Sequence, residues 1–335
     1  MNQLTLELGH GITCIDTLYM RPGLAACYLI EHDGRAAFID TGTAHTTPRL
    51  LELLSSKGLS VEDVDYVIPT HVHLDHAGGA GALIRALPNA RLVIHPRGAR
   101  HMIDPSRLVA GARVVYGEER FEQLYGTLVP VPSKRVIEAD DQFTLSLNGR
   151  EMLFLDTPGH ARHHFCIYDE QSDGIFSGDT FGISYREFDS PKGSFIFPPA
   201  TPVQFDPVAW HESIDRLMAL DPERIYLTHF CMVDNPKPLA RLLKARIDEY
   251  TLLAEAAGKD DLYGNIIAAL QQSILSQLVQ HQSPTTREEA LEILENDIDL
   301  NSQGLVVWLE RRAKQGGLGS NGVGTSKNSK RQFRQ

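Results

Sequence analysis

Residues 70–79 read THVHLDHAGG and directly follow a run of β-forming residues at 64–69. In an extended backbone the side chains alternate between two faces, so His71 and His73 project to the same side. Asp75 and His76 come after the chain turns, and they can face a second point close by. Imidazole nitrogens and carboxylate oxygens are ligands that zinc and iron favour in proteins. This segment therefore predicts a metal site, with a pattern that could serve two adjacent ions.

Four other short segments, rich in Asp, His, Thr and Gly, also lie at the ends of predicted strands. They are IDTG at 39–42, DTPGH at 156–160, SGDTF at 177–181 and LTHF at 227–230. Loops at strand ends often meet to build a site on a rigid scaffold. Each segment alone is weak, because a single His160 or His229 is more often a structural or surface histidine. Together with residues 70–79, they predict one composite site.

In this order the five segments resemble those of the metallo-β-lactamase fold superfamily, over about residues 10–235. The resemblance implies an αβ/βα sandwich of four layers with a dinuclear metal site at one edge. It implies that the first ion is held by His71, His73 and His160. It implies that the second is held by Asp75, His76 and His229, with Asp179 as the bridge. Asp40 would orient ligands through hydrogen bonds.

The organisation of the chain changes near residue 236. Residues 1–235 alternate strands and helices, with Asn148-Gly149 as a hairpin turn, and form the predicted metal-binding domain. Residues 236–315 carry helical spacing at 239–257, 262–280, 286–295 and 304–314 and are expected to form an all-helical extension. Residues 316–335 are rich in Gly and Ser and predict a disordered tail.

Composition restricts the class of protein and its partners. The formal net charge is −11, from 43 acidic and 32 basic residues, which disfavours sequence-independent binding of nucleic acid. No apolar run is long enough to span a membrane, and the N-terminus lacks the pattern of a secretory signal. The four cysteines are far apart and form no CxxC, which suits a reducing compartment. We expect a cytoplasmic protein that binds a small-molecule substrate, and amphipathic C-terminal helices make a homodimer plausible.

The resemblance implies hydrolysis of a small ester, lactone, thioester or phosphodiester by a metal-bridging hydroxide. Two divalent transition-metal ions lower the pKa of the water between them and polarise the bond to be cleaved. Zinc is the first expectation, with iron or manganese as alternatives because the same ligands accept all three. Asp75 is the expected catalytic residue, because it can accept the proton of the water or orient the hydroxide.

Two other functions stay open at this point. One is a mononuclear iron oxygenase of the persulfide dioxygenase type, in which the resemblance implies fewer metal ligands. The other is a signalling effector that keeps the fold and acts through a partner, for which the helical C-terminus offers a surface. That C-terminus could equally be a lid or a dimer surface.

Sequence details around the site favour the lactonase and glyoxalase II-like branches over the true β-lactamases. The LDHAGG ending of the first segment and the SGDTF segment carry this distinction. The position three residues after Asp179 is Gly182, where acyl-homoserine lactonases usually have tyrosine. Tyr185 is six residues on and could substitute. Tyr185, Arg186 and His164 are the expected residues of the substrate pocket.

Overall fold

The first sheet is built by the N-terminal part of the chain, whose short β-branched and apolar runs are separated by turn residues. The structure is a computed structural model that describes residues 5–318. The seven strands, in their order across the sheet, are β1 (Thr5–Glu7), β2 (Ile12–Asp16), β3 (Ala26–His32), β4 (Arg35–Ile39), β5 (Val64–Ile68), β6 (Arg91–Ile94) and β7 (Val136–Glu138). Neighbours are antiparallel from β1 to β4 and parallel from β4 to β7. Parallel neighbours require helical crossovers, which place helices on one face of this sheet.

The second sheet has six strands and opens with a tight hairpin. In order across the sheet they are β13 (Cys231–Asp234), β12 (Arg224–Leu227), β11 (Gly174–Gly178), β10 (Phe165–Asp169), β9 (Arg150–Asp156) and β8 (Thr144–Leu147). Leu147 pairs with Arg150, so Asn148 and Gly149 form the predicted two-residue turn, both with positive φ. Only β11 and β12 pair in parallel, through the crossover helix α7 (Pro207–Met218).

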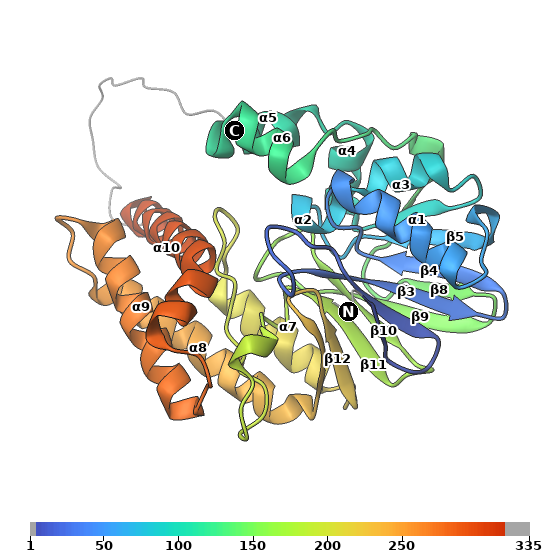
Figure 1. Cartoon of the computed structure of the whole chain (residues 1–335). Helices are drawn as coiled ribbons and strands as arrows, with labels where there is room; N and C mark the ends of the chain where they lie inside the picture. The colour runs from blue at the N-terminus through green and yellow to red at the C-terminus, as the bar shows by residue number, and fades with distance from the viewer. Residues whose placement is uncertain (1–4, 319–335) are drawn as a thin grey trace, which may run out of the picture.

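The two sheets face each other across a core of buried apolar side chains. Tyr28 and Ile39 come from the first sheet and pack with Phe154 and Phe176 of the second. Helices cover both outer faces, which gives four layers (Figure 1). The predicted αβ/βα sandwich is confirmed.

The helices of the first half pack mainly on the first sheet. They are α1 (Thr47–Ser56), α2 (Leu74–Ala77), α3 (Ala80–Ala86), α4 (Pro96–Ile103), α5 (Ser106–Tyr116) and α6 (Glu118–Tyr125). Single 3-10 turns lie at η1 (Ala44–Thr46), η2 (Val61–Asp63), η3 (Ser133–Arg135) and η4 (Arg186–Phe188). Leu50 and Leu53 of α1 and Leu83 of α3 are buried against the first sheet, whereas Phe121 and Tyr125 of α6 pack on Leu74 of α2.

Three long helices follow the second sheet: α8 (Pro236–Ala256), α9 (Leu262–His281) and α10 (Arg287–Leu318). They gather at one side of the molecule together with α7, and their apolar faces join the core on the outer face of the second sheet (Figure 1). Among the described residues, no helix is both long and apolar enough to cross a membrane.

The C-terminal region departs from the sequence prediction in two respects. The separate helical stretches expected at 286–295 and 304–314 are one continuous helix of 32 residues. Gly304, which favours a break by propensity, sits where a Cβ atom would lie 1.7 Å from the Ala200 carbonyl oxygen. The glycine therefore permits close packing of α10 rather than ending a helix. Helix α10 includes residues 316–318 of the predicted tail, and 319–335 lie outside the described residues.

Candidate metal centre

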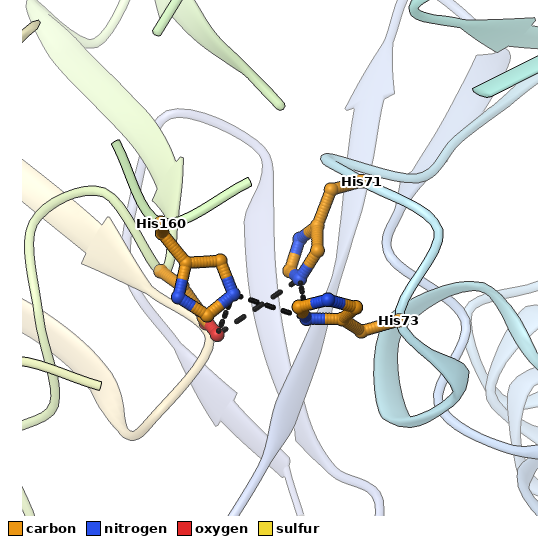
Figure 2. Close-up of side chains that lie close together, drawn as sticks. His71, His73 and His160 are labelled. Atoms are coloured by element: carbon orange, nitrogen blue, oxygen red, sulfur yellow. Dashed lines mark hydrogen bonds and ion pairs between the residues drawn. The ribbon is translucent and has the colours of Figure 1, made fainter. Parts of the chain in front are cut away.

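The loop after β5 and the short helix α2 bring the histidines of residues 70–79 to one point. His71 and His76 are fully buried. His71 Nε2 lies 2.8 Å from His73 Nδ1, and His73 Nδ1 lies 3.0 Å from His160 Nε2 (Figure 2). His160 arrives from the loop after β9, in the other half of the sandwich. Three ring nitrogens from two distant segments therefore converge.

Asp179, which follows β11, connects this group to a second one. Its Oδ2 lies 3.2 Å from His160 Nε2 and 3.9 Å from His71 Nε2. Its Oδ1 lies 3.3 Å from His76 Nε2 and 3.5 Å from His229 Nε2. One carboxylate thus faces two clusters of donors, as expected for a bridging ligand.

The second cluster consists of Asp75, His76 and His229. Asp75 Oδ2 lies 3.5 Å from His229 Nε2 and 3.8 Å from His76 Nε2, and the two Nε2 atoms are 3.3 Å apart. In each cluster the possible ligand atoms lie within 4.8 Å of one another. All seven predicted ligands are therefore brought together in two adjoining groups.

The polar atoms that face one another in the two clusters are suited to bind a cation. Asp179 Oδ1 is buried, and within residues 5–318 it has no hydrogen-bond partner. Such an orphaned carboxylate oxygen is unfavourable unless an ion or water satisfies it. Nitrogens of three imidazoles at about hydrogen-bond distance cannot all point protons at one place, but they can all offer lone pairs to a metal. The donor set of imidazole and carboxylate suits zinc, iron or manganese.

Burial and the neighbouring imidazoles hold the first cluster in the form that binds metal. Burial lowers the pKa of His71 well below its usual value, and the nearby His76 and His73 lower it further. Burial and His160 lower the pKa of His73 to about 3. Both rings are therefore neutral at physiological pH, which is the form that coordinates metal.

The carboxylates have the opposite effect on the second cluster. Burial opposes protonation of His76, but Asp179, Asp40 and Asp75 outweigh it and raise the pKa of that imidazole. The pKa of Asp179 is depressed well below its usual value, because His76 and the other histidines outweigh its burial. Negative charge at this end of the site is thus ready to be neutralised by a cation.

Hydrogen bonds from outside the clusters fix the orientation of the rings. Asp40, on the loop after β4, places Oδ2 2.9 Å from His76 Nδ1 and accepts hydrogen bonds from the Thr70 amide and the Thr228 hydroxyl at 2.7 Å each. His160 Nδ1 lies 2.9 Å from the Pro199 carbonyl, and His229 Nδ1 lies 2.7 Å from the Leu24 carbonyl. A carbonyl can only accept, so each Nδ1 carries the proton and each Nε2 is left free for a metal.

The three residues expected in the substrate pocket have different surroundings. His164 is fully buried: its Nε2 accepts the Asp179 amide at 3.1 Å, and its Nδ1 lies 3.1 Å from the Thr157 hydroxyl. Both nitrogens have protein partners, so His164 supports the loop that carries Asp179 rather than lining a pocket.

Tyr185 and Arg186 point in different directions. The buried Tyr185 hydroxyl donates to Asp297 of α10 at 3.1 Å, and the Arg21 guanidinium lies 4.5 Å from its ring centre. Arg186 instead pairs with Asp189 at 3.3 Å and lines a separate cavity beside α8 and α9. Tyr185 precedes the 3-10 turn η4 and Arg186 begins it, so the two side chains leave the backbone in different directions. The cavity that Arg186 lines contains none of the seven residues of the metal clusters.

Some residues around the site had no signal in the sequence. Asn301 of α10 is buried and hydrogen-bonds the Ala200 amide and the Pro198 carbonyl, on either side of the carbonyl that orients His160. Tyr19 and Tyr125 meet through their hydroxyls at 2.9 Å near Asp75, whose charge, after burial, raises the pKa of Tyr19. Asp297 is another: burial raises its pKa to about 6.

Comparison with known proteins is consistent with this arrangement. The profile of the metallo-beta-lactamase superfamily matches residues 20–229, which include all seven residues of the two clusters. The chain belongs to the metallo-β-lactamase superfamily. This confirms the resemblance found in the sequence.

Individual members of the superfamily are distant from this chain. The metallo-beta-lactamase fold-containing protein ST1585 of Sulfurisphaera tokodaii is 25% identical over 232 residues, which are 68% of this chain and 80% of that protein. A hydroxyacylglutathione hydrolase of Aeromonas hydrophila is 27% identical over 209 residues, 62% of each chain. An atrochrysone carboxyl ACP thioesterase of Aspergillus fumigatus is 28% identical over 156 residues, 46% of this chain and 38% of the enzyme. Superfamily membership with such relatives supports a metal-dependent hydrolase.

Solved structures share the fold over most of the chain. The ST1585 structure superimposes with a TM-score of 0.60 at 22% identity, covering 88% of this chain and 98% of that one. The metallo-β-lactamase family protein TTHA1429 of Thermus thermophilus gives 0.62 at 21% identity, covering 92% and 95%. Both alignments extend beyond residue 235, because they cover 88% and 92% of the chain and residues 1–235 are only about 70% of it.

Proposed function

We propose that this metallo-β-lactamase superfamily member is a dinuclear hydrolase of a small ester, lactone, thioester or phosphodiester. The observation that carries the proposal is the position of Asp179, whose two oxygens face two separate donor clusters. His71, His73 and His160 would hold one divalent ion, and Asp75, His76 and His229 the other. Such ions supply a water of lowered pKa and a Lewis acid for the bond that is cleaved.

Asp75 is suited to handle the proton of the attacking water. Its side chain is 23% exposed, against 6% for Asp179, so Asp75 faces the open side of the clusters. Its pKa is lowered, because the charge of His76 and the contact with His229 outweigh burial. An ionised carboxylate at this place accepts a hydrogen bond from the attacking water and so orients the lone pair of the water toward a substrate.

The remaining residues keep the ligands in place while a substrate binds. Asp40 and the carbonyls of Pro199 and Leu24 fix three of the imidazole rings, so little reorganisation is needed at each turnover. We propose that Tyr185, on the loop after Asp179, and Asp297, on α10, provide a hydroxyl and a carboxyl group for contact with the substrate. The substrate is proposed to be a small molecule, and zinc the first metal to test.

Metal content decides the proposal. Protein purified without a metal-binding tag is analysed by inductively coupled plasma mass spectrometry, and the loaded protein is then assayed on lactones, thioesters and phosphodiesters. We expect about two ions per chain and hydrolysis of at least one class. Asp179→Ala is expected to lower the occupancy of both ions, because the bridge is lost.

His163→Ala is the matched control. His163 is a buried histidine beside the clusters whose Nδ1 faces the Val72 amide at 3.5 Å, and it belongs to neither cluster. We expect its metal content to match that of the unmodified chain. Two tightly held ions in Asp179→Ala would refute the bridge. One iron per chain with oxygen consumption would favour the mononuclear oxygenase instead, and a chain that takes up no metal would favour the signalling effector.

A further inference from the structure

A cavity lies away from the metal clusters, lined by the loop at 186–194, strand β13 and helices α8 and α9. Its volume is about 780 Å³, which is within the range of pockets for small organic ligands. None of the seven residues of the metal clusters lines it. This cavity is therefore a separate feature of the molecule.

Arg246 of α8 is the unusual residue in its wall. Only 9% of Arg246 is exposed, and its guanidinium lies 4.0 Å from the ring centre of Phe195. Its Nη1 is buried without a hydrogen-bond partner in the part of the chain that the structure describes, and no carboxylate there forms an ion pair with it. Burial lowers the pKa of Arg246 to about 10, so the group is still charged at neutral pH.

Arg150 shows, by comparison, the carboxylate partner that Arg246 lacks among residues 5–318. Arg150 is also buried, but its guanidinium binds both oxygens of Asp169, at 2.8 and 2.6 Å. A buried charge without such a partner is strongly unfavourable. An anion from outside the chain would give Arg246 the partner that Arg150 finds within the chain.

Glu249 is the acidic residue of α8 in the wall of the cavity, and neutral side chains hold its carboxylate. Glu249 accepts hydrogen bonds from Ser273 and, at 2.7 Å, from Gln277. A further cation of the wall, Lys192, donates at 2.6 Å to the neutral carbonyl of Gln280, so its charge is not neutralised by that contact. Arg246 and Lys192 are thus cations of the wall that form no ion pair with a carboxylate among residues 5–318.

Besides polar side chains such as Asn235 and Gln277, and the exposed carboxylate of Asp234, the wall has an apolar part. Met232 and Val233 of β13 and Leu239 and Leu242 of α8 contribute this surface, and 46% of Leu242 is exposed. A ligand that pairs with Arg246 and also packs on this apolar part would therefore combine an oxyanion with a hydrocarbon part. A guanidinium binds carboxylate or phosphate through paired hydrogen bonds.

We infer that this cavity is a binding site for an amphipathic organic anion, whose carboxylate or phosphate pairs with Arg246 and whose apolar part packs on Leu239 and Leu242. The inference does not depend on the proposed hydrolase activity, because it uses no residue of the metal clusters. It assigns a function to α8 and α9 that the metal site does not require.

Isothermal titration calorimetry on the full chain tests the inference with octanoate as the probe. Octanamide has the same shape without the charge, and inorganic phosphate has charge without the hydrocarbon part. We expect saturable binding of octanoate and much weaker binding of the other two. Arg246→Met should weaken octanoate binding by about thirtyfold or more, the loss typical of removing one partner of a buried charge pair.

Two variants make the result specific. Arg241→Met removes a cation from an exposed position on the same helix outside the cavity and should leave octanoate binding unchanged. Leu242→Glu places a negative charge at the rim without removing a buried side chain, and should weaken octanoate but not octanamide. The second variant keeps the test valid if Arg246→Met fails to fold. Octanoate that binds the unmodified chain, Arg246→Met and Leu242→Glu equally would overturn the inference, and so would no saturable binding at millimolar octanoate.

Discussion

Replacing Gly304 with alanine is expected to destabilise the protein, although alanine is the better helix former. The change gains about 1 kcal/mol of intrinsic helix propensity. The new Cβ would lie 1.7 Å from the Ala200 carbonyl oxygen and 2.7 Å from its carbon, so α10 or residue 200 must move. Asn301, three positions earlier in α10, holds the Ala200 amide and the Pro198 carbonyl, and such a movement breaks both hydrogen bonds.

The size of the effect follows from these two groups. Each buried polar group left without a partner costs about 1–3 kcal/mol. Two such losses, less the gain in propensity, give a net decrease of about 1–5 kcal/mol in the free energy of unfolding. Domains are stable by only about 5–15 kcal/mol, so this is easily measured by urea unfolding followed by circular dichroism. Excess chelator in all samples removes any contribution from bound metal.

Gly111→Ala is the matched control for this experiment. Gly111 lies within α5, and a Cβ atom there would meet nothing within 4 Å. We expect Gly111→Ala to be as stable as the unmodified chain or more stable, by up to about 1 kcal/mol. If Gly304→Ala behaves like Gly111→Ala, the packing of α10 on residue 200 is not as we describe it.

Three further predictions concern buried carboxylates. Asp40→Asn should lower the affinity for metal about 10–100-fold, because the amide no longer orients the His76 ring as a carboxylate does. Competition with a chelating dye measures the affinity, and an unchanged value would contradict this role of Asp40. Asp297→Asn should stabilise the metal-free chain above about pH 6 by roughly 2 kcal/mol. The pKa of Asp297 in the folded chain, about 6, lies above the ordinary 3.8, so ionisation of this carboxyl group destabilises the folded state. The gain should vanish as the pH falls toward about 4, and a gain independent of pH in urea unfolding would exclude this cause. Arg150→Met should cost about 3–5 kcal/mol in urea unfolding because it leaves Asp169 buried and unpaired, and a loss below about 1 kcal/mol would argue against that pairing.

The fold and the composition of the metal clusters could be predicted because their signals are local. His71, His73, Asp75 and His76 lie within six consecutive positions, and the other segments have similar polar patterns after apolar strands. The structure confirms the layered fold and brings the expected ligands together, while their role in metal binding is a proposal.

Features that depend on the main chain or on distant contacts left no such signal. The Pro199 and Leu24 carbonyls orient His160 and His229, but every residue has a carbonyl, so no side-chain pattern marks these two. The continuity of α10 was hidden because Gly304 weakens a helix in isolation, and only its contact with residue 200 explains its presence. The different directions of Tyr185 and Arg186 depend on the 3-10 turn η4, which begins at Arg186 and was likewise not expected from the sequence.

The contact between Asn301 and residue 200 also has a consequence for synthesis of the chain. The two residues are 101 positions apart, and the ribosome adds about 5–20 residues per second, so the loop must wait about 5–20 s for its support to be made. During that time both sheets can already form, whereas Phe195 and Phe197, buried in the finished molecule, still lack the helices that cover them. A nascent chain stalled between these points would expose that apolar surface. Chaperones that bind emerging hydrophobic segments would have an opportunity to bind there.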